Sequence, residues 1–296
     1  MIDLHTHTIN SDGDFTTEET LIEAGNNGLE ILSITDHNNV NAYDELKKIP
    51  VKKYYNGIII TGVELEFVKD GRLFDMLGYG FDLDKIRNSD IIKEGITHST
   101  VEGETITLNK LKSICDSLGI IYSKDLYIKA PNNMANDVLL DDIITHKENE
   151  EKLRELGITD RSSFYRSHFC EPKSPFYIDQ TEGKYDVFYV VKTIREAGGK
   201  AFFAHPFVYK LPNLKEFLDE LVSNGLLDGI ECEHRKFTEE NIEWIKDYCN
   251  KHGLLKCGGS DRHTVKHLIG HCNNNQKVIE KELVCDWIDD IEPLNI

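Results

Sequence analysis

The feature that most constrains the fold of this chain is a repeated alternation of short apolar runs with amphipathic segments. Apolar runs rich in Ile, Leu, Val and Phe predict buried strands, and the amphipathic segments predict helices that cover them. In the first part of the chain the predicted strands span residues 2–7, 30–38, 58–67 and 73–81, and the predicted helices span 16–28 and 41–49. Thr16 and Glu19 have the spacing of a capping box at the start of the first helix.

The same alternation returns in the last third of the chain. Here the predicted strands span residues 200–207, 228–234 and 254–263, and the predicted helices span 185–199, 214–225 and 239–253. Strands that alternate with helices predict a parallel sheet, and this many units favour a barrel over an open sheet. We therefore expect an α/β chain in which residues 1–87 and 185–296 form a barrel.

Residues 88–184 interrupt this alternation. They contain helical patterns at 108–119 and 136–157 and few signals of buried strands. We expect this segment to form an inserted helical cap.

Side chains that commonly bind metals follow directly on the apolar runs. They are His5 and His7, Asp36 and His37, Glu64, His205, and Asp261 and His263. Because the carboxyl ends of all strands of a barrel meet at one rim, we expect these side chains to converge on one pocket. His5 and His7 point to the same side of their strand, since side chains alternate along an extended segment.

The chemistry of this set indicates a metal site. Imidazoles and carboxylates without a thiolate suit Mn, Fe or Zn in a multinuclear arrangement, where a carboxylate such as Glu64 can bridge two ions. The alternative is that these residues are structural His and Asp side chains at strand ends, each satisfied by its own hydrogen bonds.

Six short motifs occur in order along the chain. They are H-x-H at His5 and His7, SDG at 11–13, ITDHN at 34–38, GVE at 62–64, AHP at 204–206 and GSDRH at 259–263. With these motifs the sequence resembles the PHP family, the polymerase and histidinol phosphatase metallohydrolases. The resemblance implies a distorted (β/α)7 TIM-like barrel, a trinuclear site for three divalent ions of Mn, Fe or Zn, and hydrolysis of phosphate esters.

Carried over position by position, the resemblance implies a set of metal ligands. They are His5, His7, Asp12, His37, Glu64, Asp75, His205, Asp261 and His263. Asp75 stands where the most similar branch of the family, the nucleoside 3',5'-bisphosphate phosphatases and related short-RNA 5' exonucleases, usually has a His. A carboxylate is a harder ligand than imidazole, so we expect an altered metal preference. We assign catalytic roles to His37, Glu64, Asp261 and Arg262.

Candidate substrate contacts are fewer. Arg262 lies between two predicted ligands, although strand alternation turns it away from them. His234 ends a strand together with Glu231 and Glu233, which are as compatible with salt bridges as with a site role. Lys129 and Arg166 in the cap are candidate phosphate contacts, with solvation as the alternative. Asp36 lies on the face opposite His37, so we expect it to support the ligands.

These inferences predict a metal-dependent phosphatase. Its substrate would be a small phosphomonoester, such as a nucleoside 3',5'-bisphosphate, hydrolysed by a metal-bridged hydroxide. The alternatives within the hydrolase class are a histidinol-phosphate phosphatase and a short-oligonucleotide 5' exonuclease. The alternative of another class is a non-catalytic, metal-binding regulatory domain.

The composition and charge of the chain limit the classes of binding partner and the compartment that we expect. The formal net charge of −18 argues against a stable nucleic-acid partner or an anionic membrane surface. The seven cysteines include no C-x-x-C pair, and we expect them to be thiols of a reducing compartment. With no apolar run of membrane-spanning length and no signal-peptide pattern, we expect a cytoplasmic protein. The oligomeric state is left open.

Overall fold

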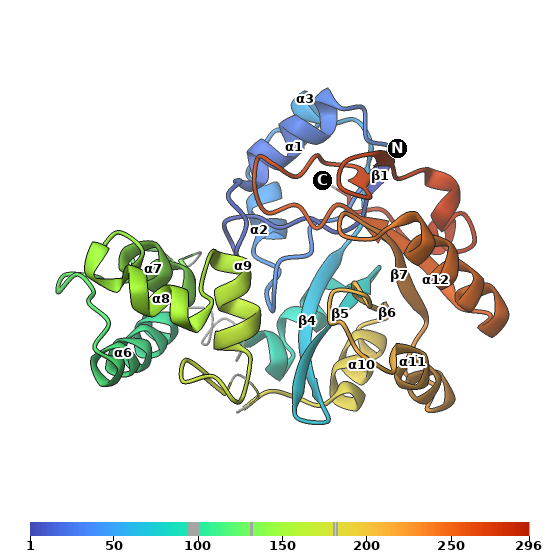
Figure 1. The fold of residues 1–296 in the computed structure, drawn as a ribbon. Coiled ribbons are helices and arrows are strands. Elements are labelled where there is room, and N and C mark those ends of the chain that lie inside the picture. The colour runs from blue at the N-terminus through green and yellow to red at the C-terminus, as the bar shows by residue number, and fades with distance from the viewer. Residues whose placement is uncertain (94–100, 131–132, 180, 182, 296) are drawn as a thin grey trace. The chain divides into compact units, whose positions relative to one another are not determined.

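The computed structural model describes residues 1–93, 101–130, 133–179, 181 and 183–295 (Figure 1). The chain divides into two compact units. The first unit combines Met1–Gly95 with Lys184–Ile296, and the second is Ile96–Gly183.

The first unit contains two main sheets. The smaller is parallel, in the order β1 (Ile2–Asp3), β2 (Ile31–Leu32), β3 (Ile58–Ile59). The larger has the order β4 (Gly62–Lys69), β5 (Arg72–Tyr79), β6 (Lys200–Phe203), β7 (Gly229–His234), β8 (Leu255–Gly259). A short antiparallel pair, β9 (His271–Cys272) and β10 (Lys277–Val278), follows near the C-terminus.

Helices of the first unit connect these strands. They are α1 (Thr17–Asn26), α2 (Ala42–Leu46), α3 (Val51–Tyr54), α4 (Leu83–Arg87), α10 (Val187–Glu196), α11 (Leu214–Ser223) and α12 (Glu239–His252). The capping box predicted at Thr16 and Glu19 is present at the start of α1, and Thr238 with Asn241 forms a second one at α12. Such caps satisfy backbone N–H groups that the first helical turn leaves free.

The expectation of a uniformly parallel sheet is wrong at β5. This strand runs antiparallel to both of its neighbours, β4 and β6. The cause is the two-residue turn Asp70–Gly71, in which both residues have positive φ, 52° and 70°. Turns of this kind match the twist of a tight hairpin, so the chain returns beside β4 without a crossover helix. Pairing is parallel from β6 to β8.

The two sheets approach each other through isolated contacts. A parallel bridge joins Thr6 to Arg262 beyond β1 and β8, and another joins His37 to Glu64 beyond β2. Strand pairing among the described residues does not close a seven-stranded barrel. The bridges nevertheless bring the carboxyl ends of β1, β2 and β8 beside β4, which positions the site described below.

The second unit is helical. Its helices are α6 (Val101–Leu118), α7 (Ala135–Ile143), α8 (Glu150–Leu156) and α9 (Arg161–Phe164), with a π-helical turn at Tyr165–Phe169. It has its own apolar core, which includes Leu111, Leu139 and Phe164. The single helix predicted over 136–157 is interrupted, because the Asn149 side chain hydrogen-bonds to backbone groups of Ile121 and Ile143. Among the residues described here, no helix combines the length and apolarity that a membrane span requires.

Candidate metal centre

The ends of the strands bring all nine predicted ligands of the first unit together. Four overlapping groups have nitrogen or oxygen atoms within 4.8 Å of one another. The groups are His7, Asp12, His37 and His263; His5, His7 and Asp261; His5, Glu64 and His205; and His37, Glu64 and Asp75. Residues separated by more than 250 positions therefore share one site, because their strands lie side by side.

Glu64 on β4 lies at the centre of the cluster and is fully buried. Its Oε2 is 3.1 Å from Nε2 of His5 and 3.2 Å from Nε2 of His7, and its Oε1 is 2.8 Å from Nε2 of His205. Burial opposes ionisation of this carboxyl, but the neighbouring His5 and His37 hold its pKa well below the usual range. Glu64 can therefore offer both oxygens as an anion.

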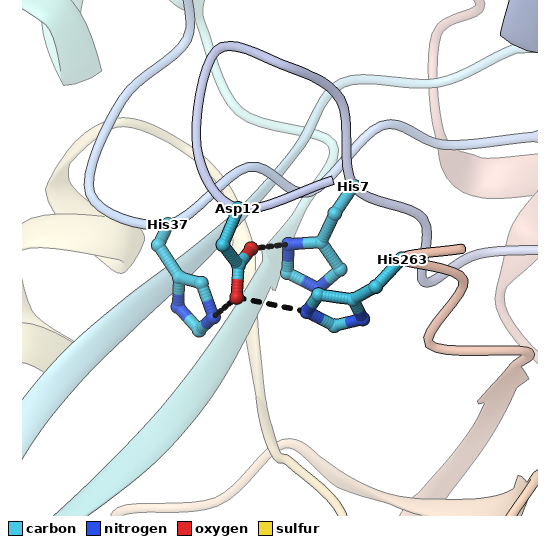
Figure 2. Close-up of side chains that lie close together, drawn as sticks. All are labelled: His7, Asp12, His37 and His263. Carbon is cyan, nitrogen blue, oxygen red and sulfur yellow. Dashed lines mark hydrogen bonds and ion pairs between the residues drawn. The ribbon is translucent and has the colours of Figure 1, made fainter. Parts of the chain in front are cut away.

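The opposite side of the cluster is more open. Figure 2 shows Asp12 among three imidazoles, with its Oδ2 2.9 Å from Nε2 of His263 and 3.8 Å from Nε2 of His37. Its Oδ1 is 3.4 Å from Nδ1 of His7. The side chains of Asp12 and His37 are 26% and 27% exposed, so a ligand from solvent can reach this edge.

Hydrogen bonds from the outer ring nitrogens orient two of the imidazoles. Nδ1 of His5 lies 2.9 Å from Oε1 of Glu231, and Nδ1 of His263 lies 2.9 Å from the carbonyl oxygen of Asp261. Since a carbonyl or carboxylate only accepts, Nδ1 donates in both rings and the Nε2 lone pair faces the cluster.

The donor set fits divalent metal ions. Nε2 of His5 and Nε2 of His7 face each other at 3.1 Å, with carboxylate oxygens beside them. The buried Nδ1 atoms of His37 and His205 have no hydrogen-bond partner among the described residues. Converging lone pairs of this kind are stabilised by a shared cation, and nitrogen with oxygen donors suits Zn, Mn or Fe.

The backbone at the strand ends is strained. Asn38, His205 and Asp261 have positive φ angles of 51°, 28° and 48°. Residues other than glycine adopt this region at a cost, and such strain concentrates at functional sites. Here it turns His205 and Asp261 into the cluster directly after β6 and β8.

Asp75 is held by a tyrosine. The hydroxyl of Tyr209 donates to Oδ2 of Asp75 at 2.9 Å and accepts from the Asp75 backbone N–H at 2.8 Å. Burial and the negative charge of Glu64 raise the pKa of Asp75 to about 6. Tyr209 has no motif that identifies it in the sequence, since only the strand pairing brings it to Asp75.

The structure does not bring two of the three predicted substrate contacts, Arg262 and His234, to the open edge. The Arg262 side chain is buried, pairs with Glu23 on α1 and lies over the Phe15 ring, with 3.2 Å from its Cζ to the ring centroid. Strand alternation turns it away from the ligands. His234 is fully buried with Nε2 3.0 Å from Oδ2 of Asp261, and Lys129 belongs to the second unit.

Several residues around the ligands were missed or left open by sequence reasoning. Glu231 accepts from the His205 backbone N–H at 2.8 Å as well as contacting His5. Arg235 donates to Oδ2 of Asp261 at 3.0 Å. Asp36, by contrast, was expected to support the ligands, and it accepts from the N–H and hydroxyl of Thr8, both at 2.7 Å, in the loop that follows His7.

Comparison with known proteins agrees with this geometry. A model of the PHP domain matches residues 3–284. The chain belongs to the PHP family.

Two relatives of this PHP chain have named activities. The 5'-3' exoribonuclease of Haemophilus influenzae is 26% identical over 269 residues, which cover 88% of this chain and 89% of the relative. The 3',5'-nucleoside bisphosphate phosphatase of Chromobacterium violaceum is 24% identical over 267 residues, which cover 88% of this chain and 87% of the relative.

Two solved structures share the fold of this PHP chain. One, described as an amidohydrolase of Chromobacterium violaceum with bound sulfate and no metal, gives a TM-score of 0.69 at 22% identity and covers 91% of this chain and 90% of its own. The other, described as a metal-dependent phosphoesterase of Bifidobacterium adolescentis, gives a TM-score of 0.67 at 23% identity, with 98% and 94% coverage. Both likenesses support an α/β PHP fold.

Proposed function

We propose that this chain hydrolyses a small phosphomonoester, a nucleotide of the nucleoside 3',5'-bisphosphate class, at a trinuclear site of Mn, Fe or Zn. The chain is a hydrolase of phosphate esters, like the named relatives in its family. The proposal adds the substrate class, the number of ions and the ligand set.

The observation that carries the proposal is the nine-residue donor set itself. Its four groups overlap at His5, His7, His37 and Glu64, which is the pattern of neighbouring ions that share ligands. A single ion would use three or four of these donors and leave the other buried carboxylates and imidazoles uncompensated.

The residues of this chain have separate tasks in the reaction. When bound, the ions supply Lewis acidity to the phosphoryl group and lower the pKa of water. Glu64, buried at the centre, joins the groups of donors. Asp12 and His37 line the open edge, where the phosphoryl group enters. Glu231 fixes the ring orientation of His5.

A second candidate is a 5'-3' exoribonuclease acting on short RNA. The observation that favours it is the likeness to the Haemophilus influenzae enzyme, which covers 88% of this chain. The formal net charge of −18 favours the mononucleotide substrate, since a basic track for the RNA backbone is not evident from the sequence.

The test is phosphate release from a substrate panel. The protein is loaded with Mn, Fe or Zn and given nucleoside 3',5'-bisphosphates, 3'- and 5'-mononucleotides, histidinol phosphate, sugar phosphates and 5'-phosphorylated RNA trimers. We expect the highest kcat/KM on a nucleoside bisphosphate, with loss of turnover after chelation. Mononucleotide release from the trimers at higher kcat/KM would favour the exoribonuclease, and selective turnover of histidinol phosphate would overturn the nucleotide assignment.

A further inference from the structure

Asp261 is held from outside the metal centre by two residues at the end of β7. Its Oδ2 accepts from Nη2 of Arg235 at 3.0 Å and lies 3.0 Å from Nε2 of His234. The Nε of Arg235 also donates to the backbone carbonyl of Asp261 at 3.0 Å. The Arg235 guanidinium thus donates hydrogen bonds to both the side chain and the main chain of Asp261.

The hydrogen bonds of His234 define which of its nitrogens carries the proton. The backbone N–H of Lys236 donates to Nδ1 of His234 at 3.1 Å, so Nδ1 accepts. In the neutral ring the proton is then on Nε2, which donates to Oδ2 of Asp261. Oδ2 therefore has two donors from the protein.

The other carboxylate oxygen faces the proposed metal ligands. Oδ1 of Asp261 lies 3.3 Å from Nε2 of His7 and 3.7 Å from Nε2 of His5. The two oxygens of one carboxylate thus have different surroundings. Oδ2 accepts from Arg235 and His234, whereas Oδ1 faces the rings of the proposed ligands His5, His7 and His263, the last with its Nδ1 at 3.3 Å.

His234 and Arg235, which together form the clamp on Asp261, are held in place by backbone hydrogen bonds. The N–H groups of Asn273 and Asn274 donate to the carbonyl oxygens of His234 and Arg235, at 3.2 Å and 2.6 Å. Asn273 and Asn274 both have positive φ, 48° and 51°. Asp261, whose φ is also positive at 48°, donates its own N–H to the His5 carbonyl at 2.8 Å.

We propose that Arg235 and His234 are positioning residues that reserve Oδ2 of Asp261 for the protein, so that Asp261 binds metal through Oδ1 alone. This inference rests on the proposed metal centre. It gives His234 a role other than substrate contact, and it makes Arg235 the cation that offsets the buried charge of Asp261. Residues that orient a metal ligand in this way contribute about 10–100-fold to metal affinity.

The experiment measures metal binding rather than turnover. The full chain and its Arg235→Gln variant are stripped and titrated with Mn²⁺ and Co²⁺ in competition with a chelator, with far-UV circular dichroism as the check on folding. We expect Arg235→Gln to weaken binding about 10–100-fold. We also expect weaker Co²⁺ visible absorption bands, because a released Oδ2 adds a ligand to the ion.

Arg195 provides a matched control. It grips Asp228 in a similar way, with Nε and Nη2 at 3.2 Å and 2.9 Å from the carboxylate and Nη1 on a backbone carbonyl. None of the proposed ligands is involved, so Arg195→Gln should leave metal affinity and the Co²⁺ spectrum unchanged. In an Asp261→Ala background, Arg235→Gln should add no further loss.

The outcomes separate the clamp from the proposed function. If the wild-type chain binds metal and Arg235→Gln binds it equally tightly, the clamp is wrong while the metal centre stands. If the wild-type chain binds no metal, both fail. His234→Gln, which keeps an N–H donor, and His234→Leu, which removes it, repeat the test should Arg235→Gln not fold. Equal affinity in those two variants would overturn the role of His234.

Discussion

At the scale of single residues, Asp75 distinguishes one of the four proposed metal-binding groups from the others. The group formed by His37, Glu64 and Asp75 has two carboxylates and one imidazole, whereas the group at Asp12 has three imidazoles. Oxygen-rich positions favour Mn or Mg, and imidazole-rich positions favour Zn. The two positions should therefore differ in metal preference.

Asp75→His should shift this preference. We expect wild-type protein, dialysed against equal concentrations of Mn²⁺ and Zn²⁺, to retain more Mn than the variant, as measured by elemental analysis. The matched control is Tyr209→Phe, which removes the hydroxyl on Asp75 but keeps both carboxylates and should retain the wild-type metal ratio. An unchanged Mn to Zn ratio in Asp75→His would show that Asp75 is not a ligand.

His263 gives the metal-free protein a pH dependence. Burial opposes its protonation, but the charges of Asp12 and Asp261 raise its pKa from 6.5 to about 8. A raised pKa stabilises the fold below about 6.5, and this contribution is lost as the pH rises through about 8. We expect the melting temperature in chelator to fall between pH 6.5 and 8.

Metal affinity should change in the opposite direction. Since a metal displaces the proton from Nε2 of His263, apparent affinity should rise up to about pH 8 and then level off. A chelator-competition titration at several pH values measures it. A flat profile from pH 6.5 to 8 would contradict His263 as a ligand.

The residues that cluster at the strand ends could be predicted from the sequence, whereas apart from Asp36 the residues that hold them could not. Imidazoles and carboxylates directly after apolar runs mark the site because strand ends meet in space. Glu231, Arg235 and Tyr209 act through hydrogen bonds that depend on strand pairing and side-chain direction. Strand pairing and side-chain direction leave no local pattern in the sequence that would identify these three residues. Arg262 was predicted as a catalytic residue and substrate contact, although strand alternation already indicated that its side chain points away from the ligands, as the structure has it.

At the scale of elements, α1 is tied to the strand ends by a buried ion pair. Arg262 pairs with Glu23 on α1, and its Nε and Nη1 have no hydrogen-bond partner among the described residues. Phe15, whose carbonyl accepts from the Ile9 N–H at 2.8 Å, closes the loop that carries Asp12. The guanidinium therefore depends on Glu23 for its charge balance.

Glu23→Gln should destabilise the protein more than Arg262→Met. The first change leaves a buried guanidinium without its anion, at a cost of roughly 2–3 kcal/mol, below that of a fully buried pair because Glu23 is partly exposed. The second removes the charge and keeps the apolar contact with Phe15. Urea denaturation of the metal-free variants measures the difference. The reverse order would contradict this account.

The extent of the elements was harder to predict than their existence. The segment 2–7 was predicted as one strand, but regular pairing covers only Ile2–Asp3, and the ligands follow in irregular backbone. The Asp70–Gly71 hairpin was not recognised, although this dipeptide is a strong turn signal. Helix periodicity located α1, α10, α11 and α12, since each buries one apolar face, and the capping box at Thr16 also indicated the start of α1.

At the scale of the whole molecule, the residues of the proposed metal centre all belong to one of two units with separate cores. None of the nine donors lies in Ile96–Gly183. Barrel closure could not be predicted from the pattern of strands and helices, because closure depends on register and on the direction of β5. The sequence pattern predicted a boundary near residue 88, whereas the compact units divide between Gly95 and Ile96 and between Gly183 and Lys184.

Removing metal should therefore lower the thermal stability of the first unit. Chelation removes the ions proposed to lie among the buried donors around Glu64. Each ion lost at 1,000 times its Kd costs about 4 kcal/mol of stability. Differential scanning calorimetry with and without EDTA should show a lower melting temperature for the first unit. A thermogram that chelation leaves unchanged would contradict a structural contribution from metal.

The central claim is that these strand-end donors form a metal centre that hydrolyses a phosphomonoester. The most direct measurement is phosphate release from adenosine 3',5'-bisphosphate by one metal-loaded preparation of wild type, His37→Ala and Asp261→Ala, with bound metal counted in each. We predict metal-dependent turnover in the wild type, a loss of at least about 100-fold in kcat/KM in both folded variants, and fewer ions bound. Chelator-sensitive turnover at wild-type rates in either variant would contradict the account.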